Sequence, residues 1–267
     1  MYDKIIMMNI VVCIKQVPDT NDVRIDPNTN TLIREGVKSI INPFDENAVE
    51  AALRLRDAGG GKVTVITMGP PQASDALKTA IAMGADEAIL ISDRAFAGAD
   101  TWATSYTLSQ AIKKLGSYDL VLFGKQAIDG DTAQVGPGVA EFLDIPQITF
   151  AISIEFEDGK LKVKRQLEDT SEIVETSLPA AVTVIKQINE PRLPSLKGQM
   201  RAKKTVIPCW SAKDIMADEN NTGLNGSPTK VVRIFTPPAR GKSELLEGEP
   251  EVIAKTLFDK LKEQKVI

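Results

Sequence analysis

The sequence predicts an α/β fold: a twisted parallel β-sheet with helices on both faces, an antiparallel extension and a C-terminal arm. Over the first two-thirds of the chain, apolar runs rich in β-branched residues alternate with stretches that carry apolar residues at helical spacing. Parallel strands need a crossover between them, so this alternation is typical of strand–helix–strand units. With 267 residues, 43% hydrophobic and 25% charged, the chain is long enough for a large domain with extensions.

The elements of this first part can be taken in order. A buried strand is expected at residues 10–14, and the short runs 23–25 and 32–33 flank a predicted hairpin turn. Glycines predict the ends of the first two helices. The expected order after the hairpin is a helix from about 48 to Gly59-Gly60-Gly61, a strand at 62–68, a helix at 76–83 before Gly84, a strand at 88–91, a helix at 101–115 and a strand at 120–123.

From about residue 147 the pattern changes to short alternating runs, at 149–156, 161–166, 173–176 and 181–185. Asp158-Gly159 is a hairpin signal, so we expect these runs to extend the sheet with antiparallel strands. The chain after Lys186 is irregular and rich in proline, with a flexible loop expected at 218–227 and an amphipathic helix at 249–262. We therefore divide the chain into an α/β domain, residues 1–186, and an arm, residues 187–267, which should wrap around another surface.

Composition excludes several classes of function. A net charge of −4 argues against nucleic-acid binding, and no stretch is long enough to predict membrane insertion. The N-terminus lacks the pattern of a signal peptide, and the presence of only 2 cysteines fits a reduced, cytoplasmic setting. The chain has 0 histidines, which excludes Ser-His-Asp and Cys-His catalysis and argues against a structural zinc site. Any redox chemistry must come from a bound cofactor.

The most informative segment is the polar loop Gly124–Pro137, which follows the apolar run 120–123 and leads into a helix expected near Ala133. Backbone amides at the start of a helix lack internal partners and lie at the positive end of its dipole, so they bind anions. Small residues let a phosphate approach the backbone. The pattern predicts a phosphate site, and a strand–loop–helix crossover without a ligand is the equal alternative.

In parallel sheets, ligands bind beyond the carboxyl ends of the strands, near a switch in strand order. The loops that begin after Lys15, at Gly69 and at Gly124 qualify by their positions. We expect them to lie together.

Five segments in order along the chain resemble the β subunit of electron-transfer flavoproteins. Gly124-Lys125-Gln126-Ala127-Ile128-Asp129 is similar to the nucleotide-binding segment of that family. The other similar segments are residues 42–50, 80–86, 163–180 and 189–204. The resemblance implies an adenine-nucleotide-binding, Rossmann-like fold and a heterodimer with an α subunit.

The family's nucleotide contacts carry over by position. The matching residues are Cys13, Lys15, Asn42, Pro43, Phe44, Asp45, Gly69, Gly124, Lys125, Gln126, Ala127, Asp129, Gly130, Asp131, Thr132, Ala133, Gln134, Val135, Gly136 and Pro137. Asp45 could accept hydrogen bonds from an adenosine, or it could be a helix N-terminal charge. Lys125 could neutralise phosphate or be a surface lysine. Cys13 is more typical of a core residue, and Phe44 of a packing residue.

One branch of the family holds structural AMP in this subunit, with a single FAD in the α subunit; the other holds a second FAD here and bifurcates electrons. The Gly130, Ala133 and Gly136-Pro137 pattern resembles the bifurcating branch, as does the segment 15–20. That resemblance implies NADH as hydride donor, with ferredoxin or flavodoxin and an acyl-CoA or 2-hydroxy-acid dehydrogenase as acceptors. The remaining alternative is a stand-alone ATP-binding domain, but the segment 15–20 lacks the glycine-rich ATP loop of that class.

The segment 189–204 resembles the family's loop for docking on the dehydrogenase, and the matching positions are Arg192, Leu196 and Lys203. An apolar anchor inside a basic rim is typical of an interface. Alternatively, Leu196 lies on an amphipathic helix with Leu193 and Met200, all facing the core, and the basic residues form a solvated face.

Overall fold

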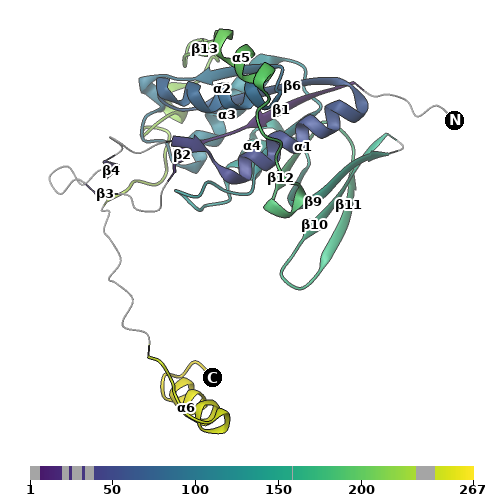
Figure 1. Cartoon of the computed structure of the whole chain (residues 1–267). Coiled ribbons are helices and arrows are strands. Elements are labelled where there is room, and N and C mark those ends of the chain that lie inside the picture. The colour runs from purple at the N-terminus through teal and green to yellow at the C-terminus, as the bar shows by residue number, and fades with distance from the viewer. Residues whose placement is uncertain (1–6, 20–23, 26–31, 34–38, 158, 233–243) are drawn as a thin grey trace. The chain divides into compact units, whose positions relative to one another are not determined.

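The computed structural model describes residues 7–19, 24–25, 32–33, 39–157, 159–232 and 244–267. The chain forms two compact units, Met1–Val232 and Arg233–Ile267. The first unit is built on a nine-stranded sheet in the order β11-β10-β9-β12-β8-β1-β6-β7-β13 (Figure 1). This arrangement confirms the predicted α/β class.

Parallel strands form the centre of this sheet. They are β1 (Met8–Cys13), β6 (Gly61–Met68), β7 (Glu87–Ile91), β8 (Leu120–Gly124) and β12 (Ala180–Val184). β1 pairs with β6 on one side and with β8 on the other. The chain runs outward from β1 through β6 to β7, then returns to place β8 on the opposite side. The switch in strand order therefore lies between β1 and β8, where ligands of such sheets bind.

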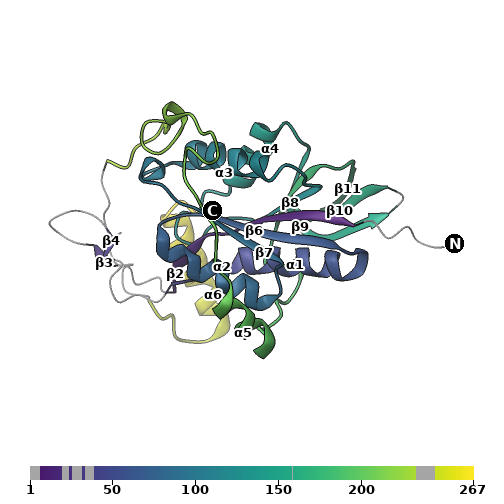
Figure 2. The same cartoon turned by 90° about the horizontal axis from the view of Figure 1, so that it is seen from above.

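Helices cover both faces of the sheet, as predicted. Figure 2 shows α1 (Pro43–Gly59) and α2 (Ser74–Met83) on one face, and α3 (Thr101–Leu115) and α4 (Val135–Leu143) on the other. Successive side chains of a strand point to opposite faces. Thus Ile10 and Val12 of β1 pack in the cluster with α1 and α2, whereas Val11 and Cys13 pack in the cluster with α3 and α4.

Three strands extend the sheet: β9 (Gln147–Glu157), β10 (Lys160–Gln166) and β11 (Ser171–Thr176). β10 runs antiparallel to both of its neighbours, which confirms the antiparallel extension. The prediction was wrong for the run 181–185, because β12 is parallel to both β8 and β9. All five residues of β12 are buried, as expected of a strand covered on both faces.

Short elements complete the first unit. β2 (Gln16–Pro18) pairs antiparallel with β5 (Ser39–Ile41), and β3 (Arg24–Ile25) pairs antiparallel with β4 (Leu32–Ile33). The turn predicted between β3 and β4 lies outside the described residues. Helix α5 (Leu196–Lys204) packs beside α2, and β13 (Cys209–Trp210) is parallel to β7 at the sheet edge. Single 3-10 turns lie at Pro71–Ala73, Arg94–Phe96, Lys186–Ile188 and Glu219–Asn221.

The segment 218–227 is not the flexible loop that its polar composition predicted. Ser227 is buried and its hydroxyl accepts a hydrogen bond from the Asp100 amide at 2.9 Å, while the Leu224 amide donates to the Ala97 carbonyl at 3.2 Å. Asp100 caps α3 and also accepts from the Thr229 hydroxyl at 2.7 Å. Ser227 and Thr229 thus tie this segment to the start of α3, whereas Asp218, Asn220 and Asn225 are exposed.

The second unit contains α6 (Pro250–Glu263), which confirms the predicted C-terminal helix. Lys260 pairs with Glu244 at 2.9 Å, and Val252, Leu257 and Phe258 are exposed on the unit. Of the helices in the described ranges, none has the length and apolarity needed to cross a bilayer.

Candidate functional site

The structure brings together the loops that follow β1, β6 and β8 at the carboxyl edge of the sheet. These strands are neighbours in the order β8-β1-β6. The Thr67 hydroxyl at the end of β6 donates to the Ile14 carbonyl at 2.7 Å, and Gln16 Nε2 donates to the Gln72 carbonyl at 3.1 Å. The loops at Lys15, Gly69 and Gly124 therefore meet at the switch in strand order, as their positions in the sequence implied.

Asp45 joins two of these loops from the first turn of α1. Its Oδ2 accepts from the Lys15 amide at 2.7 Å and its Oδ1 accepts from the Gly124 amide at 3.2 Å. The side chain is buried, and burial raises the pKa of Asp45 to about 7, although the Asn42 side chain and the two backbone amides lower it by hydrogen bonding. Asp45 is thus more than a helix N-terminal charge: it ties the ends of β1 and β8.

Asn42, which precedes α1, shapes the polar loop in a similar way. It is fully buried; its Nδ2 donates to the Gln126 carbonyl at 2.8 Å, and its Oδ1 accepts from the Ile128 amide at 3.0 Å. Its own amide donates to the Lys15 carbonyl at 2.9 Å. The side chains of Asn42 and Asp45 therefore form hydrogen bonds with the backbone of this chain. These bonds set the shape of the loops that surround the site.

Gly124 has to be a glycine. A Cβ at this position would overlap Asp45 Oδ1 and lie 2.6 Å from the Phe44 carbonyl carbon. Gly136 is constrained in the same way, because a Cβ there would lie 2.6 Å from Thr183 Cγ2. Both ends of the loop are thus held closely against the body of the domain, while a Cβ at Gly130 would meet nothing within 4 Å.

The end of this loop carries backbone amides that have no partner in the part of the chain that the structure describes. Helix α4 begins at Val135, slightly later than the predicted Ala133, and Gln134 before it makes no side-chain cap. Among the residues that the structure describes, no protein oxygen accepts from the amides of 132–136. Asp131 and Ala133 have φ values of 53° and 54°, so the backbone turns sharply before the helix starts. Unpaired amides at a helix start are the donors that an anion requires.

Charged and polar side chains surround the loop. Lys15 Nζ pairs with Asp129 Oδ1 at 2.6 Å, and Gln126 Nε2 donates to Asp131. Lys125 Nζ lies 5.4 Å from the centre of the Phe150 ring. Thr132 and Gln134 are exposed, and the Gln134 side chain accepts from the Thr101 hydroxyl at 3.0 Å.

Cys13 and Phe44 lie at the end of β1 and in the first turn of α1. The Cys13 thiol is buried among apolar side chains, and burial, followed by the nearby Asp45 charge, raises its pKa well above the ordinary value. It is a neutral core thiol. Phe44 is half-buried with Lys186 Nζ 5.5 Å from its ring centre, and Pro43 starts the helix. The remaining predicted residues, Ala127, Val135 and Pro137, are partly buried parts of the loop.

The segment 189–204 lies on the α1 and α2 face. Leu193, Leu196 and Met200 are 89%, 76% and 56% exposed, so they do not face the core of this chain. Lys203 is exposed as well, whereas Arg192 turns inward to Glu50 and Asp57. Sequence reasoning missed Glu50 and also Asn47, whose Nδ2 donates to the Asn189 carbonyl at 2.9 Å. The sequence feature that could have identified them is the placement of a charged residue, Glu50, and an amide residue, Asn47, among the apolar positions of α1.

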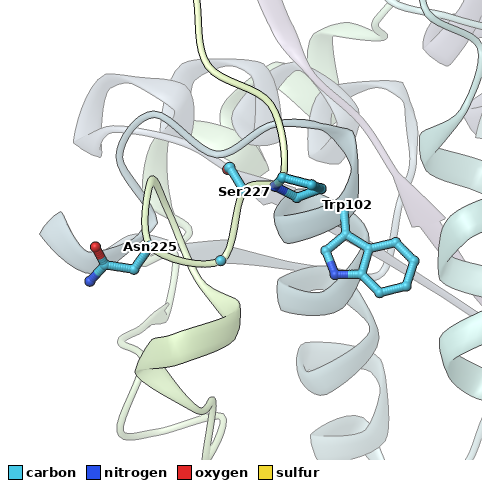
Figure 3. A pocket seen from close by; sticks show the side chains of 5 residues that line it. Trp102, Asn225 and Ser227 are labelled. Atoms are coloured by element: carbon cyan, nitrogen blue, oxygen red, sulfur yellow. The ribbon is translucent and has the colours of Figure 1, made fainter.

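A surface pocket near the start of α3 was also not predicted from the sequence. It is lined by Trp102 at the start of α3 and by Asn225, Gly226, Ser227 and Pro228. In Figure 3, Trp102 and Asn225 lie on opposite sides of the view, with Ser227 between them. The Trp102 ring packs edge-on against Phe142 of α4, with 4.8 Å between ring centres.

Comparison with known proteins adds to this geometry. The sequence-family model described as electron transfer flavoprotein domain matches residues 29–215 of this chain. The chain is 56% identical to the electron transfer flavoprotein subunit beta of Thermoanaerobacterium thermosaccharolyticum, over 97% of this chain and 100% of that protein. It is 53% identical to the caffeyl-CoA reductase-Etf complex subunit CarD of Acetobacterium woodii, with the same coverage. It is 48% identical to the protein FixA of Azorhizobium caulinodans, over 88% of this chain and 86% of that protein.

Proposed function

The chain belongs to the electron transfer flavoprotein family as a β subunit, the partner of an α subunit in electron transfer, and on that premise we propose that its loop Gly124–Pro137 holds FAD. The observation that carries this proposal is the group of amides at 132–136. They have no acceptor within the described part of the chain, and they stand at the start of α4, beside the switch between β1 and β8. A diphosphate fits such donors.

Different residues around the loop would hold different parts of the cofactor and of the site. The amides at 132–136 would bind the diphosphate, and Lys125 would add positive charge. The open space at Gly130 would let the ligand approach the backbone. Asn42 and Asp45 would keep the loops at Lys15, Gln126 and Gly124 in place, as their hydrogen bonds do here. The chain has 0 histidines, and the proposed role requires no side chain to act as a nucleophile.

FAD bound there would supply the redox chemistry. In the proposed role, NADH would donate a hydride and ferredoxin or flavodoxin would receive one of its electrons. A dehydrogenase would receive the other electron through the FAD of the α subunit. Two observations favour this bifurcating role. The Gly130, Ala133 and Gly136-Pro137 pattern resembles that branch, and one similar protein is a subunit of a caffeyl-CoA reductase-Etf complex. An acyl-CoA or 2-hydroxy-acid dehydrogenase is the proposed partner, in a cytoplasmic setting.

The second candidate is a subunit that holds structural AMP, because the same amides could bind a single phosphate. Counting cofactors separates the two. The purified heterodimer is denatured and its released nucleotides are measured. The proposal expects FAD from both subunits, whereas FAD from the α subunit alone together with AMP would establish the second candidate.

We further propose that the segment 193–204 docks on the dehydrogenase. Three exposed apolar side chains, Leu193, Leu196 and Met200, stand beside the basic residues Lys197, Lys203 and Lys204. Exposed apolar groups inside a polar rim are typical of a docking site, and the lysines favour a partner with an acidic rim. The guanidinium of Arg192, the third expected docking residue, is held by Glu50 and Asp57 of this chain and would fix the base of the segment.

A further inference from the structure

The tip of the loop that follows β8, residues 129–133, has few contacts with the rest of the chain. Its residues are exposed, except for the half-buried Ala133. Within the part of the chain that the structure describes, one ion pair joins the tip to a segment outside the loop: Asp129 Oδ1 lies 2.6 Å from Lys15 Nζ. Lys15 belongs to the loop after β1, so the pair connects the two loops on either side of the switch in strand order.

The loop is fixed on both sides of its tip. Asn42 Oδ1 accepts from the Ile128 amide at 3.0 Å before the tip, and the Thr101 hydroxyl donates to the Gln134 side chain at 3.0 Å after it. The backbone of Lys15 is held as well, since its carbonyl accepts from the Asn42 amide at 2.9 Å. The tip is therefore a short flap between two fixed points, and the Lys15 side chain reaches it from a fixed backbone.

We propose that the ion pair Lys15–Asp129 is a latch: it holds the tip 129–133 against the loop after β1 and slows the release of the nucleotide from the loop Gly124–Pro137. When the pair breaks, the tip can move while the contacts on either side of it persist, so opening does not require the domain to unfold. This inference rests on the proposed function, because it requires a nucleotide in the loop.

The pair is suited to repeated opening because it is partly exposed. The Lys15 side chain is 49% exposed and the Asp129 side chain is 26% exposed, so water replaces much of the interaction when the pair breaks. Ion pairs of this kind change an equilibrium by about twofold to fivefold, and that is the size of effect that we expect for the latch. The latch therefore tunes the rate of release and does not decide whether the nucleotide binds.

Hydrogen exchange and nucleotide release in the purified heterodimer test the latch. Lys15→Met and Asp129→Asn each remove the ion pair without altering a backbone amide. In each variant, we expect hydrogen exchange at Gly130 and Asp131, whose amides donate to the Ala127 carbonyl at 3.3 and 2.8 Å, to be about twofold to fivefold faster. Release of FAD from this subunit, followed by a chase with isotope-labelled FAD, should accelerate by a similar factor. The double variant should match the single ones, because all three lose the same pair.

Lys62→Met is the matched control. Lys62 pairs with Glu87 at the same distance of 2.6 Å and with similar exposure, but this pair lies where β6 and β7 begin, away from the loops after β1 and β8. Its loss should leave both the exchange of the tip and the release of FAD unchanged.

Each outcome discriminates. Faster release in Lys15→Met together with slower release in Asp129→Asn would mean that Lys15 binds the phosphate directly, which overturns the latch and leaves the proposed function standing. Unchanged exchange or unchanged release in both variants, additive effects in the double variant, or an equal effect of Lys62→Met overturns the latch in the same way. If this subunit holds AMP and no FAD, the proposed function fails, and the same comparison of AMP release still decides on the latch.

Discussion

Arg192 Nε lies 2.7 Å from Glu50 Oε2, and this ion pair joins residues that are 142 positions apart in the sequence. The Glu50 side chain is almost fully buried on α1, and its Oε1 also accepts from Arg54 at 2.7 Å. Arg192 reaches Asp57 as well, at 2.9 Å. The pair therefore fixes the start of the exposed segment 193–204 to a helix of the main domain, which gives a docking segment a rigid base.

Replacing Glu50 with Gln should destabilise the protein, because the Arg192 and Arg54 guanidinium groups lose their buried, charged partner. We expect a loss of roughly 1–3 kcal/mol in the free energy of unfolding, measured by urea denaturation. The matched control is Asp57→Asn, which removes a more exposed partner of the same Arg192 and should cost less than about 1 kcal/mol. Equal losses in both variants would contradict the central role of Glu50.

The same pair predicts a dependence of stability on pH. Burial raises the pKa of Glu50, but the hydrogen bonds from Arg192 and Arg54 outweigh it, so the pKa is lowered below the usual 4.5. A carboxyl whose pKa is lowered on folding stabilises the protein above its unfolded pKa and loses that contribution as pH falls. Denaturation curves of Glu50→Gln and the unaltered chain should therefore differ most near neutral pH and converge below about pH 4.5. A constant difference across this range would refute the prediction.

Gly130→Glu should weaken FAD binding in the β subunit. A side chain fits at this position without displacing protein, since a Cβ at Gly130 meets nothing within 4 Å, so the effect should come from charge beside the diphosphate. We expect a loss of roughly 1–3 kcal/mol in binding, seen as FAD released from this subunit while the α-subunit FAD stays. Gly130→Gln is the neutral control of similar size and should bind nearly normally. Full flavin occupancy in the Glu variant would mean that the diphosphate lies elsewhere.

Gly124→Ala should damage the site by a steric route. The added methyl group would overlap Asp45 and lie 2.6 Å from the Phe44 carbonyl carbon, so the start of α1 or the end of β8 must move. Such overpacking costs typically about 1–3 kcal/mol of stability, and the displaced loop should also bind nucleotide more weakly. Gly116→Ala separates backbone strain from crowding: it places a side chain at a positive φ of 84° with nothing within 4 Å, so it should cost stability but leave flavin content unchanged. A variant of Gly124 with unchanged melting and unchanged flavin content would contradict the close packing described here.

Leu196→Ala should slow electron transfer to the dehydrogenase while leaving flavin reduction by NADH and thermal stability nearly unchanged. Because Leu196 is 76% exposed, its truncation removes little packing within this chain. An interface anchor is worth about 1–2 kcal/mol, so we expect roughly a fivefold to thirtyfold rise in the concentration needed for half-maximal transfer. Met216→Ala, which truncates another exposed apolar side chain outside the segment, should have no such effect. Equal transfer rates in both variants would exclude Leu196 as the anchor.

Local pattern was sufficient to predict most of the helices and strands of this chain. Residues 101–115 were predicted as a helix and form α3 with those bounds, because apolar periodicity and terminal residues act within one turn. The loop after β8 was also recognisable, since its glycines and its place between a strand and a helix are local features. Local pattern could not give the direction of β12, because a short buried strand pairs in either orientation and the choice depends on which strands lie beside it.

The chemistry of the site depended on contacts between distant parts of the chain. The sequence by itself determined the α/β class, the family and the segments that surround the switch in strand order. Only the tertiary structure decided that Asp45 receives the amides of Lys15 and Gly124, and that Arg192 turns inward to Glu50 while Leu196 faces outward. The physical reason is that hydrogen bonds, burial and the resulting pKa depend on neighbours brought together by folding, up to 142 residues apart in these pairs.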